Sequence, residues 1–246
     1  MLDFVKRIVV VGAGGIGTWL LTPLCRFLMA ENFKGQVAIW DGDRFEPKNM
    51  LRQDFSEESL NVNKAEAKAL ELKEIFPELQ LFGYNEYVTS KNVELAVKED
   101  DLVITCVDNF PARALIANMA EQLKNICVLS VGNEMFDGNC HVTLRRNGIP
   151  LTVPLIDRHP EVAKIKTGDR AELGCGELID SGETQLLFVN LYAATVTLVC
   201  FYLLWAYGNK HGKKRLTTIP GEIYFDILLA KSDVILSEPI KLKERL

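Results

Sequence analysis

Apolar residues along the chain form patterns that predict alternating strands and helices. Short runs rich in β-branched residues are typical of strands buried on both faces. Such runs predict strands at 8–11, 37–40, 79–84, 102–107 and 126–131. Apolar residues at helical spacing, or strong helix formers, predict helices over 20–28, 63–76 and 112–123. Strands that alternate with helices in this way favour one α/β domain with a doubly wound, mainly parallel sheet.

The second half of the chain follows a different pattern. Alternating polarity and turn residues predict further strands at 141–145, 223–229 and 234–236. Asn147-Gly148 is typical of a tight hairpin turn, so we expect an antiparallel C-terminal extension of the sheet. Residues 150–183 lack a clear period and carry several prolines and glycines. We expect them to form a long, partly mobile connection within a single domain that spans 1–246.

The stretch from Leu186 to Tyr207 is almost free of charged residues. It is long enough to cross a bilayer, which takes roughly 20 residues. Three polar residues interrupt it, namely Asn190, Thr195 and Thr197, and the sequence has no second span of this kind. We therefore expect a helix buried in the core or in a dimer interface, and no membrane association.

Composition and charge narrow the class of protein. Of the 246 residues, 48% are apolar and 25% are charged, and the formal net charge is −5. These values are typical of a soluble globular protein. The acidic balance argues against nucleic acid as a partner, because nucleic-acid binding needs a dense basic surface. The six cysteines include no CxxC pair, which argues against a zinc site and is typical of a protein in the reducing cytoplasm.

The candidate chemistry begins directly after the first strand. The run Gly12-Ala13-Gly14-Gly15-Ile16-Gly17 contains the GxGxxG pattern of nucleotide-binding loops. Its glycines let the backbone approach a phosphate, and the N-terminus of the following helix favours negative charge. Asp41 ends the second strand 24 residues after Gly17, where a carboxylate can bind the ribose of either NAD or ATP. A tight turn that binds no ligand is the alternative interpretation.

Polar residues further along the chain favour ATP over NAD. The run 49–53 follows the second strand, Lys64 opens the next helix, and Asp108-Asn109 closes a later strand. Hydride transfer does not require such cations beside phosphates. Nucleotidyl transfer does, because negative charge moves onto the leaving pyrophosphate. A carboxylate at a strand end, here Asp108, also suits a Mg²⁺ ion that bridges phosphates.

Taken in order, these motifs resemble the ThiF/MoeB group of adenylating enzymes, which are related to the ubiquitin-activating enzymes. The resemblance covers most of the chain. Its motifs are the glycine loop, Asp41-Gly42-Asp43, Asn49-Met50-Leu51-Arg52-Gln53, Lys64, Cys106-Val107-Asp108-Asn109 with Arg113, and the late Tyr224-Phe225-Asp226. The connection that contains Leu173-Gly174-Cys175 is most similar to the ThiF-like proteins of PRTRC-type gene clusters. The resemblance implies the Rossmann-like adenylation fold of this family and a homodimer.

The resemblance also implies a role for each matching residue. Gly15 would contact the phosphates of ATP through its backbone, Asp41 would bind the ribose, and Asp108 would hold Mg²⁺. Arg52 and Lys64 would stabilise charge in the transition state. The implied nucleotide-binding residues are Gly12, Gly14, Gly15, Gly17, Asp41, Asp43, Asn49, Arg52, Gln53, Lys64, Asp108 and Asn109. The implied reaction joins AMP to the C-terminal carboxylate of a small ubiquitin-like protein and releases pyrophosphate.

Three features depart from the family pattern. Many relatives bind structural zinc through two CxxC pairs, which this chain lacks, so we expect no zinc. Only seven residues precede the first strand, so we expect no N-terminal helix with the arginine that reaches the partner subunit's ATP; Arg7 is expected to be structural. Thioester-forming relatives use a cysteine after the core sheet. Cys175 is the candidate for that role here, with an incidental or structural role as the alternative.

Two other functions stay open on the sequence. One is a small-molecule enzyme, either an ATP-dependent dehydratase that acts on modified tRNA or an NAD-dependent oxidoreductase. The other is a nucleotide-binding scaffold without activity. The lack of the N-terminal arginine favours the scaffold, whereas the set of Arg52, Lys64 and Asp108 argues for catalysis.

Overall fold

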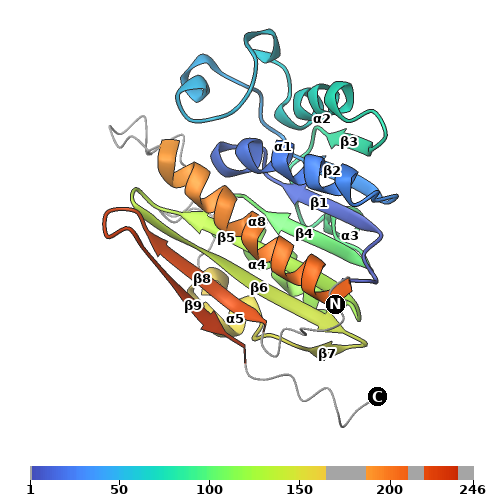
Figure 1. Cartoon of the computed structure of the whole chain (residues 1–246), viewed down its shortest axis with the longest axis vertical. Coiled ribbons are helices and arrows are strands. Elements are labelled where there is room, and N and C mark those ends of the chain that lie inside the picture. Colours follow the sequence, from blue (N-terminus) through green and yellow to red (C-terminus); the bar gives the residue numbers. More distant parts are fainter. Residues whose placement is uncertain (1, 165–186, 210–218, 238–246) are drawn as a thin grey trace.

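The computed structural model describes residues 2–164, 187–209 and 219–237, which form one mixed sheet covered by helices (Figure 1). The strand order is β3-β2-β1-β4-β5-β6-β8-β9, with β7 paired to β6. The first five strands are parallel, and they are β1 (Arg7–Val11), β2 (Gln36–Trp40), β3 (Gln80–Tyr84), β4 (Asp101–Thr105) and β5 (Ile126–Asn133). The antiparallel strands are β6 (Asp137–Arg146), β7 (Ile149–Pro150), β8 (Pro220–Asp226) and β9 (Lys231–Leu236).

Helices cover both faces of this sheet. One face carries α1 (Gly15–Ala30), α2 (Lys64–Ile75) and α8 (Leu187–Asn209), and the other carries α3 (Val93–Ala96), α4 (Phe110–Glu121), α5 (Leu155–Arg158) and α6 (Glu161–Lys164). Two 3₁₀ helices, η1 (Pro47–Leu51) and η2 (Glu57–Ser59), lie between β2 and α2. Alternate residues of β1 show why both faces are apolar: Ile8 and Val10 pack on the side of α1, while Val9 and Val11 pack on the side of α4.

The doubly wound sheet with an antiparallel extension confirms the predicted fold class. The ends of some predicted elements were wrong. The strand predicted at 102–107 ends at Thr105, and the helix predicted at 112–123 begins at Phe110. The earlier start has a local cause, because the Asn109 side chain accepts a hydrogen bond from the N–H of Ala112 and caps the helix.

The antiparallel strands also differ from their predicted ends. The strand predicted at 141–145 begins at Asp137, because it pairs with β5 on one side and with β8 on the other. The terminal strand predicted at 223–229 is shifted toward the N-terminus, to 220–226, and the one predicted at 234–236 begins earlier, at 231, and ends at 236 as predicted. A carboxylate oxygen of Asp226 accepts the N–H groups of Leu228 and Leu229 and closes the turn earlier than the apolar pattern indicates.

The predicted connection at 150–183 begins with two short helices, α5 and α6. Leu155 and Val162 pack against Ala117 of α4, so this first part of the connection lies on the face of the sheet that α4 covers. Residues 165–186 lie outside the described residues, and Cys175 is among them. The predicted mobility of the connection and the proposed role of Cys175 therefore stay predictions.

Helix α8 is the apolar stretch expected at 186–207. By length and composition alone, the segment Leu187–Trp205 could cross a membrane, and half of it is buried inside the protein. Its buried side packs against α1, β5 and β6, as the core helix of a sheet layer does. The opposite side exposes a stripe of apolar residues at helical spacing, namely Phe188, Tyr192, Val199 and Tyr202.

Arg7 has the structural role expected from its position at the start of β1. Its guanidinium forms two hydrogen bonds with the carboxylate of Asp101, at 2.6 and 3.0 Å, and donates to the backbone carbonyls of Leu95 and Ala96. Both side chains are almost completely buried. The neighbouring pair, Lys6 and Asp100, has an equally short contact of 2.6 Å, but Lys6 is 79% exposed.

These two adjacent pairs give a matched test of burial. Arg7→Leu should lower the free energy of unfolding by about 3 kcal/mol, because the Asp101 carboxylate stays buried without its cation. Lys6→Leu should leave the stability unchanged within error, because water screens an exposed pair. Urea unfolding of the three proteins measures both effects. Equal losses for the two variants would contradict the structural role given to Arg7.

Candidate active site at the carboxyl ends of the parallel strands

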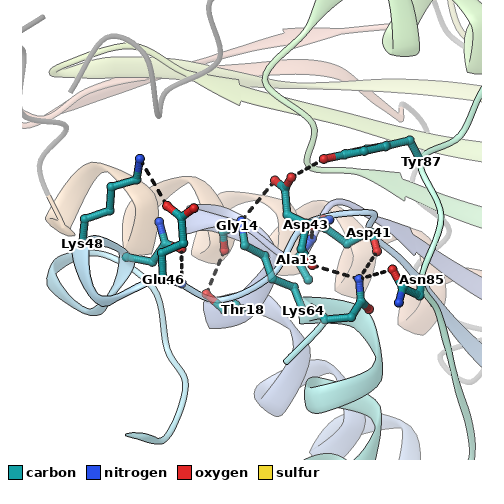
Figure 2. A network of polar contacts seen from close by, with 12 residues as sticks. Ala13, Gly14, Thr18, Asp41, Asp43, Glu46, Lys48, Lys64, Asn85 and Tyr87 are labelled. Atoms are coloured by element: carbon teal, nitrogen blue, oxygen red, sulfur yellow. Dashed lines mark hydrogen bonds and ion pairs between the residues drawn. The ribbon is translucent and has the colours of Figure 1, made fainter. Parts of the chain in front are cut away.

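The candidate site lies where β1 ends and α1 begins. β1 is flanked by β2 on one side and β4 on the other, so the crossovers on its two sides run in opposite directions along the sheet. Open α/β sheets bind ligands at this switch point, outside the carboxyl ends of the strands. The polar residues predicted from the sequence follow β1, β2 and β4, and therefore lie at one edge of the sheet. Figure 2 shows those that follow β1 and β2, together with Lys64.

The glycine loop makes a turn that side chains would block. Gly12 has φ +96°, and a Cβ placed there would lie 2.9 Å from the carbonyl carbon of Cys106 at the end of β4. A Cβ on Gly17 would lie 2.0 Å from the carbonyl oxygen of Gly12. No side chain caps the first turn of α1, whose N-cap is Gly14. The positive end of a 16-residue helix is therefore directed at the edge of the sheet, which is the arrangement that binds anions.

Asp41 connects this turn to β2. One of its carboxylate oxygens accepts the N–H of Ala13 at 2.6 Å, and the other accepts the N–H of Asp43 at 2.8 Å. Burial raises the pKa of Asp41, while the nearby Lys64 ammonium and the two N–H donors act in the opposite direction. The carboxylate predicted to bind a ribose thus also fixes the shape of the glycine loop.

Asp43 and Lys64 form the charged part of the site. The Lys64 ammonium lies 3.2 Å from a carboxylate oxygen of Asp43 and is almost completely buried at the start of α2. The hydroxyl of Tyr87 donates to the other oxygen of Asp43, and this bond raises the pKa of Tyr87 well above its usual range. Figure 2 shows Tyr87 and Lys64 reaching Asp43 from opposite sides.

Asn63 joins the strand ends to α2. Its side-chain oxygen accepts the N–H of Glu66 and caps the helix. Its amide nitrogen donates at 2.8–2.9 Å to the backbone carbonyls of Asp41 and Asp43 and to the side chain of Asn85. The capping role is visible in the sequence. The three further bonds are not, because their acceptors lie about 20 residues away in either direction.

The segment that carries Asn49, Arg52 and Gln53 is buried against α1. Asn49 accepts the N–H of Glu46 and forms a capping box in η1. The backbone carbonyl of Arg52 accepts the indole N–H of Trp19 at 3.1 Å, which ties this segment to α1. A Cβ on Gly14 would lie 4.0 Å from the amide nitrogen of Gln53, which places this side chain beside the glycine loop.

Lys68 on α2 also contacts the segment that carries Arg52 and Gln53, through the neighbouring Asp54. Its ammonium is completely buried and contacts the Asp54 carbonyl at 3.2 Å and both carboxylate oxygens of Glu71 at 2.9–3.0 Å. The N–H of Asp54 in turn donates to the hydroxyl of Thr18 on α1. The sequence analysis overlooked Lys68, because a lysine on a helix is usually exposed.

Asp108 and Asn109 follow the end of β4. Asp108 is exposed, and its charge contributes to the raised pKa of Tyr87. The charges of Asp41 and Asp43 raise the same pKa, so all three carboxylates lie near the Tyr87 side chain. Asn109 caps α4 with its side chain. Within the described ranges no group of three or more His, Cys, Asp and Glu residues could hold a metal ion. A Mg²⁺ ion at Asp108 would therefore depend on phosphate oxygens for the rest of its ligands.

The structure thus links the glycine loop, Asp41, Asp43 and Lys64 through direct contacts, places Gln53 beside the loop and buries Arg52 in the same segment as Gln53. A model of the ThiF family matches residues 4–200. The chain belongs to the ThiF family. This confirms the resemblance drawn from the motifs.

Relatives of this ThiF-family chain include named activating enzymes. It is 32% identical over 136 residues to the sulfur carrier protein adenylyltransferase of Thermus thermophilus, covering 55% of this chain and 48% of the relative. It is 32% identical over 112 residues to the SAMP-activating enzyme E1 of Haloferax volcanii, covering 45% and 40%. The chain spans about half or less of the length of these curated relatives.

Solved structures share the fold at lower identity. E. coli MccB, solved with ATP, superposes with a TM-score of 0.66 at 19% identity, covering 98% of this chain and 66% of that chain. PaaA superposes with a TM-score of 0.64 at 16% identity, covering 96% and 66%. The fold of almost the whole chain is therefore shared with solved structures.

The two asparagine caps give a matched test of the site's scaffold. Asn63→Asp keeps a good N-cap on α2 but removes the amide that binds two backbone carbonyls, so we expect a loss of about 2 kcal/mol in unfolding free energy. Asn109→Asp keeps the cap on α4 and should change stability by less than about 0.5 kcal/mol. Urea unfolding without nucleotide tests both. Equal stability of the two variants would show that Asn63 is only a helix cap.

Proposed function

We propose that the chain adenylates the C-terminal carboxylate of a small ubiquitin-like protein, using ATP and Mg²⁺ and releasing pyrophosphate. The observation that carries this proposal is the contact of Asp41 with the glycine loop beside the uncapped N-terminus of α1, with the buried Lys64 ammonium on the neighbouring Asp43. The family membership and the two relatives named as activating enzymes support the class of reaction. The cytoplasm is the proposed compartment.

The proposed chemistry needs positioned charges and no general base. A carboxylate oxygen of the substrate attacks the α-phosphorus, the bond from that phosphorus to the α–β bridging oxygen breaks, and its electron pair leaves with pyrophosphate. The substrate carboxylate is already ionised at neutral pH. Backbone N–H groups of the glycine loop, Arg52 and Lys64 would stabilise the charge on the phosphates.

The charge balance of the site supports a role for Mg²⁺. Asp41, Asp43 and Asp108 place three carboxylates at the edge, and the Lys64 ammonium is already paired with Asp43. A polyphosphate would be repelled unless Lys64 moves from Asp43 to a phosphate or a further cation enters. Mg²⁺ bound by one carboxylate and by phosphate oxygens supplies that cation. Asp108, exposed at the end of β4, would hold it.

Pyrophosphate exchange tests the proposed reaction. The chain is incubated with ATP, Mg²⁺, labelled pyrophosphate and the cognate small protein, and label should enter ATP. Lys64→Ala and Arg52→Ala should each lower the exchange rate by at least about 100-fold, because each removes a charge-stabilising group. Cys175→Ala serves as a control and should exchange normally, because the adenylation step contains no cysteine. ATP binding without exchange for any candidate small protein would reject the function.

We also propose that the protein is a homodimer that covers the exposed stripe of α8. An apolar stripe on a soluble protein is typical of an interface. Val199→Lys should convert the dimer into a monomer, because Val199 is 45% exposed and would be buried at the interface. Leu70→Lys on α2, where Leu70 is 64% exposed, should stay dimeric. Sedimentation velocity distinguishes the two states, and a monomeric wild type would contradict the proposal.

A further inference from the structure

A buried amide from α8 reaches the N-terminus of α1. Asn190 lies in the first turn of α8 and is 1% exposed. A Cβ built on Gly15, the first residue of α1, would lie 2.6 Å from the side-chain nitrogen of Asn190 and 3.0 Å from its oxygen. The absence of a side chain at Gly15 is what allows the amide to occupy this position.

Of the two polar atoms of the Asn190 amide, the oxygen forms a hydrogen bond among the described residues and the nitrogen does not. Its oxygen accepts a hydrogen bond of 3.2 Å from the side-chain nitrogen of Asn133, the last residue of β5. Its nitrogen is buried and has no hydrogen-bond partner among the residues that the structure describes. A buried amide N–H that stays unpaired costs free energy, so native proteins pair it with protein, water or a ligand.

The buried Asn190 nitrogen and the N-terminus of α1 lie next to each other. The first turn of α1 has no capping side chain and no acidic residue of its own, and the Asp41 carboxylate accepts the N–H of Ala13 just before that turn. The Asn190 nitrogen adds a donor beside the N–H groups of that turn. Donors from a helix terminus and a side-chain amide, together with the helix dipole, form a site whose chemistry selects an anion with several oxygens, such as a phosphate.

We propose that Asn190 donates a hydrogen bond to a phosphate oxygen of the bound nucleoside triphosphate, and that Asn133 positions it. This inference deepens the proposed function and rests on it for the identity of the ligand. The phosphate site is then built from three elements: the N-terminus of α1, the end of β5 and the first turn of α8. Gly15 serves two purposes, because it offers its own N–H and leaves room for Asn190.

Two substitutions at Asn190 isolate the donor. Asn190→Leu has nearly the same size and removes every hydrogen bond of the amide. Asn190→Asp keeps an oxygen that accepts from Asn133 and replaces the NH₂ group with a negatively charged oxygen that cannot donate, whereas Asn190→Leu removes the donor without adding charge. Thr197→Val is the matched control, because Thr197 is also buried on α8 and its hydroxyl donates to the Ala193 carbonyl of its own helix. Thermal unfolding of each variant confirms that the protein folds.

Calorimetric titration with ATP and with adenosine provides the test. Asn190→Leu and Asn190→Asp should weaken ATP binding by about tenfold or more, because a bond to a charged group is lost, while adenosine binds as in the wild type. Thr197→Val should bind both as the wild type does. In Asn190→Asp, ATP affinity should recover as the pH falls, because the protonated carboxyl can donate a hydrogen bond.

Each outcome decides the matter. Unchanged ATP affinity in both Asn190 variants would overturn the role of Asn190, and so would an equal loss for ATP and adenosine, because that pattern indicates a general disturbance of α8. A wild type that binds no ATP would overturn both this inference and the proposed function. If the variants lose ATP affinity although the wild type shows no pyrophosphate exchange, the role of Asn190 stands and the proposed reaction fails.

Discussion

The turn from β1 into α1 is the constraint on which the rest of the structure depends. The chain leaves a central strand and enters a long buried helix within three residues, and only glycine fits where this turn touches the end of β4. The turn directs an uncapped helix terminus at the edge of the sheet. Asp41 holds the turn through Ala13, and Asn63 in turn holds the strand end that carries Asp41. Stability and ligand chemistry therefore share the same contacts.

Much of the fold could be predicted from the sequence because its parallel half is regular. Buried strands and amphipathic helices alternate, and a doubly wound sheet is the usual solution for such a chain. The ends of the antiparallel strands could not be predicted, because they depend on partners distant in sequence. β6 is longer than its alternating pattern indicates, because it pairs with both β5 and β8. The turn at Asp226 ends β8 earlier than predicted, and β9 therefore begins earlier.

The residues of the candidate site also differ in whether the sequence can predict them. Residues within local motifs, such as the glycine loop and Lys64, could be identified because spacing along one strand or helix places them. Residues that act across the fold could not. Asn190 bonds to a residue 57 positions earlier, and Tyr87 reaches Asp43 over 44 positions. Neither belongs to a motif, and in the sequence Asn190 is only a polar interruption of an apolar stretch.

Nucleotide preference is the most direct measurement of what the edge of this sheet binds. Isothermal titration calorimetry of the wild-type protein with ATP and with NAD, each with Mg²⁺, compares the two cofactors that a glycine loop and Asp41 could accept. The arrangement of Arg52, Lys64 and Asp108 predicts that ATP binds and that NAD does not bind measurably under the same conditions. Binding of NAD without binding of ATP would contradict the assignment of this edge as an ATP site.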